Sequence, residues 1–128
     1  MPVQRVLMTK PVVDSLLTYS RLQHPREGIL LLRGRKKGKE MVEVESLVIP
    51  PNAIHGDGFS SFSWNMLPID LSFIGVAHSH PSGHAVPSDQ DLLHATGRIM
   101  VIVGYPYSDE SSVRVYDLNG RELPIELV

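Results

Sequence analysis

The sequence contains no cysteine and no long apolar run, and each absence excludes a class of protein. Without cysteine the chain forms no disulfide and offers no thiolate nucleophile, so any metal ion must be held by His, Asp or Glu. No apolar stretch reaches the roughly 20 residues that span a bilayer, and residues 1–5 lack the pattern of a signal peptide. We therefore expect a cytoplasmic protein without a membrane partner.

The sequence also lacks a large excess of charge of either sign. Twelve Lys and Arg residues face fourteen Asp and Glu residues, which gives a formal net charge of -2. A chain so nearly balanced has no general attraction to nucleic acid, so we expect no nucleic-acid partner. The length of 128 residues and the 42% hydrophobic content suit one globular domain over residues 1–128 with its own core.

The apolar patterns predict an α/β domain. An amphipathic helix is expected at 10–23, with Thr9 as its N-cap, and a second helix from Ser88 onward, with Leu92, Leu93 and Ala95 or Thr96 inside. Strands are predicted at 3–8, 28–33, 41–49, 73–77, 99–104, 113–118 and 122–127. With a weak edge strand within 52–64, the order β-α-β-β-β-β-α-β-β-β predicts a mixed β-sheet flanked by two helices.

Three connections complete this prediction. The basic segment 34–39 is expected to be a solvated turn, and Asn119-Gly120 a hairpin turn after which 122–127 pairs back. Residues 52–63, which contain two glycines, are interpreted as a loop or a weak edge strand. Whether this loop covers a site, and what His55 does, the sequence leaves open.

The most informative stretch joins a buried strand to a helix start. The apolar run ending at Ala77 is followed by His78 and His80, which point to the same face because strand side chains alternate. After a Pro/Gly/Ser loop, Ser88 and Asp91 open the next helix. Two imidazoles and one carboxylate can thus meet at the end of the strand, with the nitrogen and oxygen donors that suit Zn²⁺.

The full spacing is far from chance, although the histidine pair alone is not. With six histidines, one His-x-His is expected roughly 0.3 times in a chain of this composition. Adding Pro81, Ser88 and Asp91 at fixed offsets lowers that expectation to about 1 in 10,000. Ser88-x-x-Asp91 also fits a capping box, and both interpretations can hold together for Ser88.

His78-Ser79-His80-Pro81, followed after six residues by Ser88 and after two more by Asp91, resembles the signature of the JAMM (MPN-plus) metallopeptidases. That family places a glutamate between its first helix and the next strand, and Glu27 stands there in this sequence. Segments 66–68 and 101–106 also resemble small archaeal members, so the resemblance covers nearly the whole chain. It implies a single-domain, cytidine-deaminase-like MPN/JAMM fold.

The resemblance also implies a chemistry. His78, His80 and Asp91 would bind Zn²⁺, and Glu27 would take a proton from the attacking water and pass it to the departing amine. Ser88 would donate a hydrogen bond to the oxyanion. The substrates implied are ubiquitin-like modifiers joined to lysines, with the modifier's tail gripped between residues 56–64 and the 81–87 loop. The chain is too compact for both insertions of the linkage-specific deubiquitinases, which favours a broad isopeptidase.

Two other functions remain open from the sequence. JAMM relatives also process sulfur-carrier proteins of ubiquitin fold, and sequence does not separate the two activities. Metal-free MPN subunits act as scaffolds, but they typically lack the ligands that are present here. A cytidine deaminase is excluded because its cysteine ligands are absent. The true modifier, the role of His84 and the oligomeric state, with a homodimer as one option, are not determined by the sequence.

Overall fold

The computed structural model describes residues 2–50 and 72–128. The predictions for the 52–63 loop, the segment 66–68 and the 56–64 wall of the tail groove lie outside these residues. The described elements are β1 (Arg5–Met8), α1 (Lys10–Gln23), β2 (Ile29–Lys37), β3 (Met41–Val48), β4 (Phe73–His80), α2 (Asp89–Leu93), β5 (Ile99–Gly104), the 3₁₀ helix η3 (Glu110–Ser112), β6 (Val113–Tyr116), β7 (Glu122–Leu123) and β8 (Ile125–Leu127).

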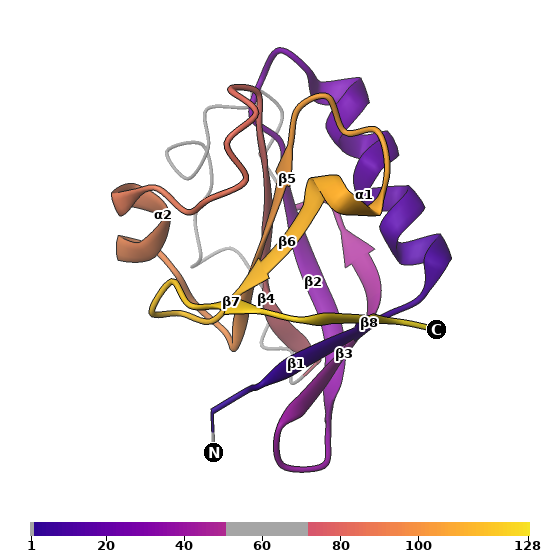
Figure 1. Ribbon diagram of the computed structural model, residues 1–128, viewed down its shortest axis with the longest axis vertical. Coiled ribbons are helices and arrows are strands. Elements are labelled where there is room, and N and C mark those ends of the chain that lie inside the picture. Colours follow the sequence, from indigo (N-terminus) through magenta and orange to yellow (C-terminus); the bar gives the residue numbers. More distant parts are fainter. Residues whose placement is uncertain (1, 51–71) are drawn as a thin grey trace.

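The eight strands form one mixed sheet in the order β7-β6-β5-β4-β2-β3-β1-β8 (Figure 1). Strand β4 runs parallel to β5, and β1 runs parallel to both β3 and β8, whereas the other neighbours are antiparallel. Strands β4 and β5 are almost wholly buried, as their continuous apolar sequences require. The predicted mixed sheet flanked by helices is confirmed.

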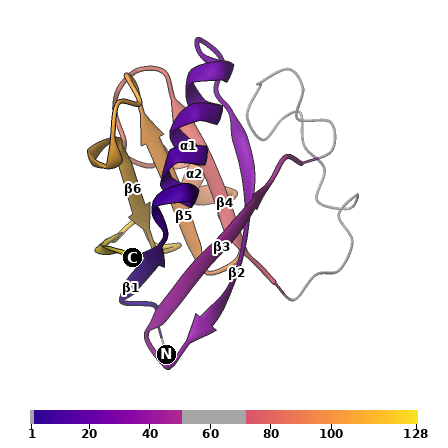
Figure 2. The same ribbon diagram turned by 90° about the vertical axis from the view of Figure 1, so that its right-hand side faces the viewer.

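Helix α1 covers one face of the sheet, as Figure 2 shows. It begins where the sequence predicts, because the Thr9 hydroxyl accepts a hydrogen bond from the Val12 amide. Its apolar stripe, Val12, Val13, Leu16 and Leu17, is buried against the main core. The other face carries α2 and the 81–87 loop over a smaller cluster. In the part of the chain that the structure describes, no helix is long and apolar enough to cross a membrane.

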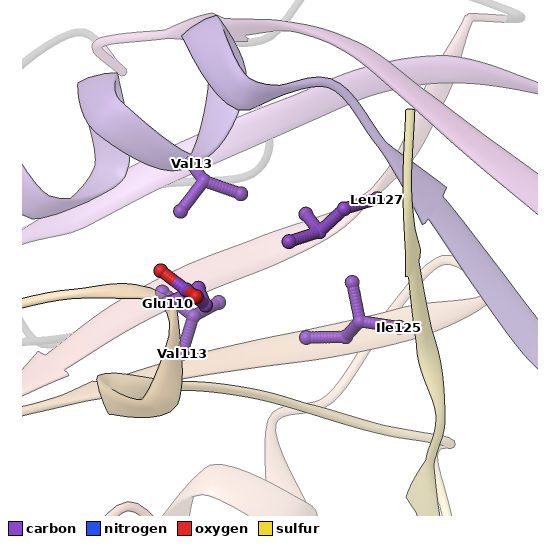
Figure 3. A pocket seen from close by; sticks show the side chains of 5 residues that line it. All are labelled: Val13, Glu110, Val113, Ile125 and Leu127. Atoms are coloured by element: carbon purple, nitrogen blue, oxygen red, sulfur yellow. The ribbon is translucent and has the colours of Figure 1, made fainter.

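A pocket of about 200 Å³ opens on the α1 side of the sheet (Figure 3). Four aliphatic side chains and the Glu110 carboxylate surround it, and the residues are Val13, Glu110, Val113, Ile125 and Leu127. None of the predicted site residues is among them, so this pocket is separate from the predicted metal site.

The structure corrects the prediction of a basic turn at 34–39. Strand β2 continues to Lys37, and the turn contains only residues 38–40. The cause is cross-strand charge pairing, because Arg35 and Lys37 lie 3.6 and 3.3 Å from the Glu43 carboxylate of β3. Gly34 permits the bulge at this point, since a Cβ there would lie 1.9 Å from the Glu43 carbonyl oxygen.

Two further predictions were wrong in their extent. The single strand predicted at 122–127 divides at Pro124: β7 pairs back with β6, but β8 crosses over to pair with β1. Helix α2 ends at Leu93 rather than near Thr96, and Leu93 is exposed rather than inside. Leu92 and Ala95 do pack on the sheet, so one short turn suffices to bury the apolar residues.

Candidate metallopeptidase site

Antiparallel pairing of β2 with β4 brings Glu27 to the two histidines. Ile29 is the register partner of His78, so Glu27 lies just beyond the end of β2, beside the end of β4. Two hydrogen bonds lock this junction: the Gly28 amide donates to the Ser79 hydroxyl at 2.7 Å, and the Ser79 amide donates to the Gly28 carbonyl at 3.0 Å. Ser79, whose side chain points away from the histidines, therefore acts in positioning Glu27.

His78 is buried and lies against Glu27. Its imidazole Nδ1 is 3.2 Å from the Glu27 Oε1 atom, although the two residues are 51 positions apart in sequence. The His78 side chain has no exposed surface, whereas a third of the Glu27 side chain is exposed. Glu27 can therefore reach both the buried histidine and a substrate arriving from solvent.

The side chains of His80 and Asp91 face each other at the separation expected for two ligands of one metal ion. The His80 Nδ1–H donates to the His84 carbonyl at 2.8 Å, which leaves Nε2 to face Asp91 Oδ2 at 3.1 Å. In the protonated ring Nε2–H can donate to this carboxylate, whereas in the neutral ring that keeps Nδ1–H, Nε2 carries a lone pair and two electron-pair donors meet. Two ligands of one tetrahedral zinc, each about 2.0 Å from it, are separated by about 3.3 Å. The donor set therefore fits a zinc ion, and the carbonyl behind Nδ1 is the usual support of a metal-binding histidine.

The start of α2 fixes Asp91 through a capping box, which confirms that part of the prediction. The Ser88 hydroxyl accepts from the Asp91 amide at 3.0 Å, and the Ser88 amide donates to Asp91 Oδ2 at 2.9 Å. Burial alone would raise the pKa of Asp91, but hydrogen bonds from His80 and Ser88 and the nearby imidazoles lower it to about 2. The carboxylate is thus ionised at neutral pH.

The pKa of His80 is shifted the other way. Burial lowers it, but the hydrogen bond to Asp91, the His84 carbonyl and the charges of Asp91 and Glu27 outweigh burial and raise the pKa. The same oxygens that favour a proton at this point favour a metal cation.

Among the described residues, Glu27, His80 and Asp91 offer donor atoms that all lie within 4.8 Å of one another. His78 joins this group through its contact with Glu27. The structure thus brings together the three predicted metal ligands and Glu27. It groups Glu27 rather than His78 with the other two donors, and the assignment of His78 as the third ligand stays a prediction. Ser88 lies at the edge of the group as the N-cap of α2.

Sequence reasoning missed two supporting groups. The His84 carbonyl orients His80, but a main-chain atom leaves no signal in the residue type. Ser79 was predicted to face away from the ligands, which is correct. Its hydrogen bond to Gly28 could have been found only by knowing that β2 pairs with β4.

Comparison with known proteins shows the family to which this chain belongs. The family of prokaryotic homologues of the JAB domain matches residues 9–118. A Haloferax volcanii protein named a probable metalloprotease is 32% identical over 122 residues, which cover 91% of this chain and 75% of that protein. A Thermus thermophilus protein named a probable TtuB-protein conjugate cleaving protease is 29% identical over 89 residues, 62% of this chain and 55% of its own.

Solved structures share the same fold. A JAB1/MPN domain protein from Archaeoglobus fulgidus has a TM-score of 0.69 at 31% identity, with 94% of this chain and 97% of that chain covered. A structure described as JAMM, a metalloprotease-like zinc site in the proteasome and signalosome, has a TM-score of 0.64 at 27% identity and covers 98% of both chains. The chain therefore belongs to the family of prokaryotic homologues of the JAB domain and is a JAMM-type zinc metallopeptidase.

Proposed function

We propose that this metallopeptidase is an isopeptidase that hydrolyses the bond between the C-terminus of a ubiquitin-like modifier and a lysine. The observation that carries the proposal is the meeting of Glu27, His80 and Asp91 donor atoms within 4.8 Å, with His78 beside Glu27. The Thermus thermophilus relative, named for cleaving protein conjugates, supports this substrate class. A cytoplasmic location and one domain over 1–128 stay predictions.

In this proposal His78, His80 and Asp91 hold the zinc ion, which when bound polarises a carbonyl and makes water a better nucleophile. Glu27, one third exposed beside the donors, accepts a proton from the nucleophile and delivers it to the lysine amine as the amide bond breaks. The Ser88 hydroxyl accepts from the Asp91 amide and keeps its own O–H, which can donate to the oxyanion.

The test is a cleavage panel run on metal-analysed protein. The substrates are a ubiquitin-fold modifier joined to lysine through an isopeptide bond, the same modifier joined head to tail through a linear peptide bond, and a sulfur-carrier protein bearing a C-terminal adduct. The proposal predicts that the isopeptide is cleaved fastest and that His80→Ala abolishes cleavage. Faster turnover of the sulfur-carrier adduct would assign the second activity instead. If the zinc-loaded protein cleaves none of these substrates, both the isopeptidase activity and the sulfur-carrier activity are contradicted.

A further inference from the structure

The 81–87 loop links two parts of the proposed metal site, because it leads from His80 to Ser88. The loop is tied to His80 through main-chain groups. The His84 carbonyl accepts from His80 Nδ1–H, and the His80 carbonyl accepts from the amides of Gly83 and Tyr105, both at 3.1 Å. The position of this loop therefore sets the direction in which the His80 ring points.

Tyr116, on β6, holds the next carbonyl of this loop. Its phenol O–H donates a short hydrogen bond to the Ala85 carbonyl, directly after the His84 carbonyl that contacts His80. The Tyr116 ring is 4% exposed and packs with Met100 and Ile102. Burial and the charge of Glu122 raise the pKa of the Tyr116 phenol, against a smaller opposing effect of Arg114, so the group stays protonated and able to donate.

Packing alone restrains this loop only in part. A cavity of about 390 Å³ lies between residues 83–86 and the segment formed by Gly104, Tyr105 and the 111–114 region. A Cβ on Gly104 would lie 3.1 Å from the Gly83 carbonyl oxygen and 3.2 Å from the Ala85 Cβ, so the loop approaches the end of β5 closely at Gly83 and Ala85. A directional hydrogen bond from a fixed side chain is the feature that can set the orientation of its peptide groups.

We propose that Tyr116 is a positioning residue for the metal site: by holding the Ala85 carbonyl, it keeps the His84 carbonyl on His80 Nδ1 and so keeps Nε2 directed at Asp91. Tyr116 touches neither the metal donors nor, in this proposal, the substrate. The inference rests on the proposed metal site, but its first consequence, the orientation of the His80 ring, concerns the metal-free protein.

The test compares Tyr116→Phe with Tyr107→Phe. Both tyrosines are buried and both use the phenol in one hydrogen bond, but Tyr107 contacts His24, the C-cap residue of α1, and not the loop. The first readout is the set of ¹H and ¹⁵N chemical shifts of the His80 ring in metal-free protein, measured by NMR at the same pH for the parent and both variants. We expect parental His80 shifts in Tyr107→Phe and altered shifts in Tyr116→Phe, because the ring then loses its fixed acceptor.

The second readout is zinc affinity by competition with a chromophoric chelator. Tyr116→Phe is expected to weaken zinc binding on the order of 10- to 100-fold, as loss of such outer support does elsewhere. Placing 4-aminophenylalanine at position 116 restores a hydrogen-bond donor and should restore zinc affinity. This variant keeps the test usable if Tyr116→Phe folds poorly. Unchanged His80 ring shifts together with unchanged zinc affinity would overturn the positioning role. If His80→Ala leaves zinc affinity unchanged, the proposed metal site fails instead.

Discussion

At the scale of single residues, Glu27 can be either a zinc ligand or the group that moves protons, and one substitution separates these roles. Its carboxylate offers a donor atom within 4.8 Å of the donor atoms of His80 and Asp91, and it also contacts His78. Glu27→Gln keeps the shape but removes the proton acceptor. We predict that the variant keeps about one zinc per chain and loses roughly 100- to 10,000-fold in cleavage rate.

The matched control for this prediction is Glu126→Gln on β8, an exposed glutamate paired only with Arg5 among the described residues. It should leave both zinc content and cleavage rate unchanged. Loss of zinc from Glu27→Gln, measured by metal analysis after gel filtration, would make Glu27 a ligand and reassign the proton transfer.

Much of the site could be predicted from single residues, and there is a physical reason why the rest could not be predicted. Strand alternation places His78 and His80 on one face, and helix-start chemistry places Asp91 and Ser88 near them. Glu27 could be found only through the family resemblance, since it reaches the site across the β2–β4 pairing. Long-range pairing of strands leaves no local signal, and neither does the His84 carbonyl.

At the scale of secondary-structure elements, Ser88 has two roles that two substitutions separate. Ser88→Asp keeps an N-cap of similar strength for α2, whereas Ser88→Ala removes the cap and costs about 1 kcal/mol of stability. Neither side chain can donate a hydrogen bond to an oxyanion at neutral pH. We therefore predict near-parental thermal stability for Ser88→Asp, lower stability for Ser88→Ala, and about a 100-fold loss of cleavage rate in both. A fully active Ser88→Asp would limit Ser88 to capping.

The turn that joins β6 to β7 depends on an ionised carboxylate. Burial by itself raises the pKa of Asp117, but hydrogen bonds from the Arg121 amide, the Arg121 guanidinium and the Asn119 amide lower it. Arg121 also reaches the Val3 carbonyl and so ties the N-terminal segment to this turn. Asp117 is thus more acidic in the folded than in the unfolded chain.

It follows that the stabilisation by Asp117 is fully present above the unfolded pKa of about 4 and is lost as pH falls through the lower folded value. Asp117→Asn should be less stable than the parent by about 1 to 2 kcal/mol at neutral pH, and the gap should close in acid. Urea unfolding across pH measures it, with exposed Asp14→Asn as control. A gap independent of pH would show that charge is not involved.

For the whole molecule, the mixed character of the sheet could be predicted from the sequence, but the order of its strands could be predicted less well. Buried apolar runs predict β4 and β5, but the alternation in residues 122–127 does not indicate that β8 leaves its hairpin to pair with β1. Pro124 is the one local sign, because it interrupts main-chain pairing. The short α2 likewise reflects tertiary packing, since Leu92 and Ala95, both partly buried, pack against the sheet without further helical turns.

Removal of the metal should also lower the stability of the whole folded chain. A ligand that binds only the folded state stabilises it by about 4 kcal/mol at a thousand times its dissociation constant. We predict that EDTA lowers the midpoint of thermal unfolding, that added zinc restores it, and that Asp91→Asn is insensitive to both. An equal response of Asp91→Asn to zinc would place the binding elsewhere in the chain.

The central claim is that the cluster of Glu27, His78, His80 and Asp91 hydrolyses an isopeptide bond with zinc. The most direct measurement is the release rate of a ubiquitin-fold modifier from a lysine conjugate, by protein shown to carry one zinc per chain. We predict release that stops with chelator, returns with zinc and is absent in His80→Ala. Release that persists in His80→Ala, or none from fully zinc-loaded parent protein, would contradict the account.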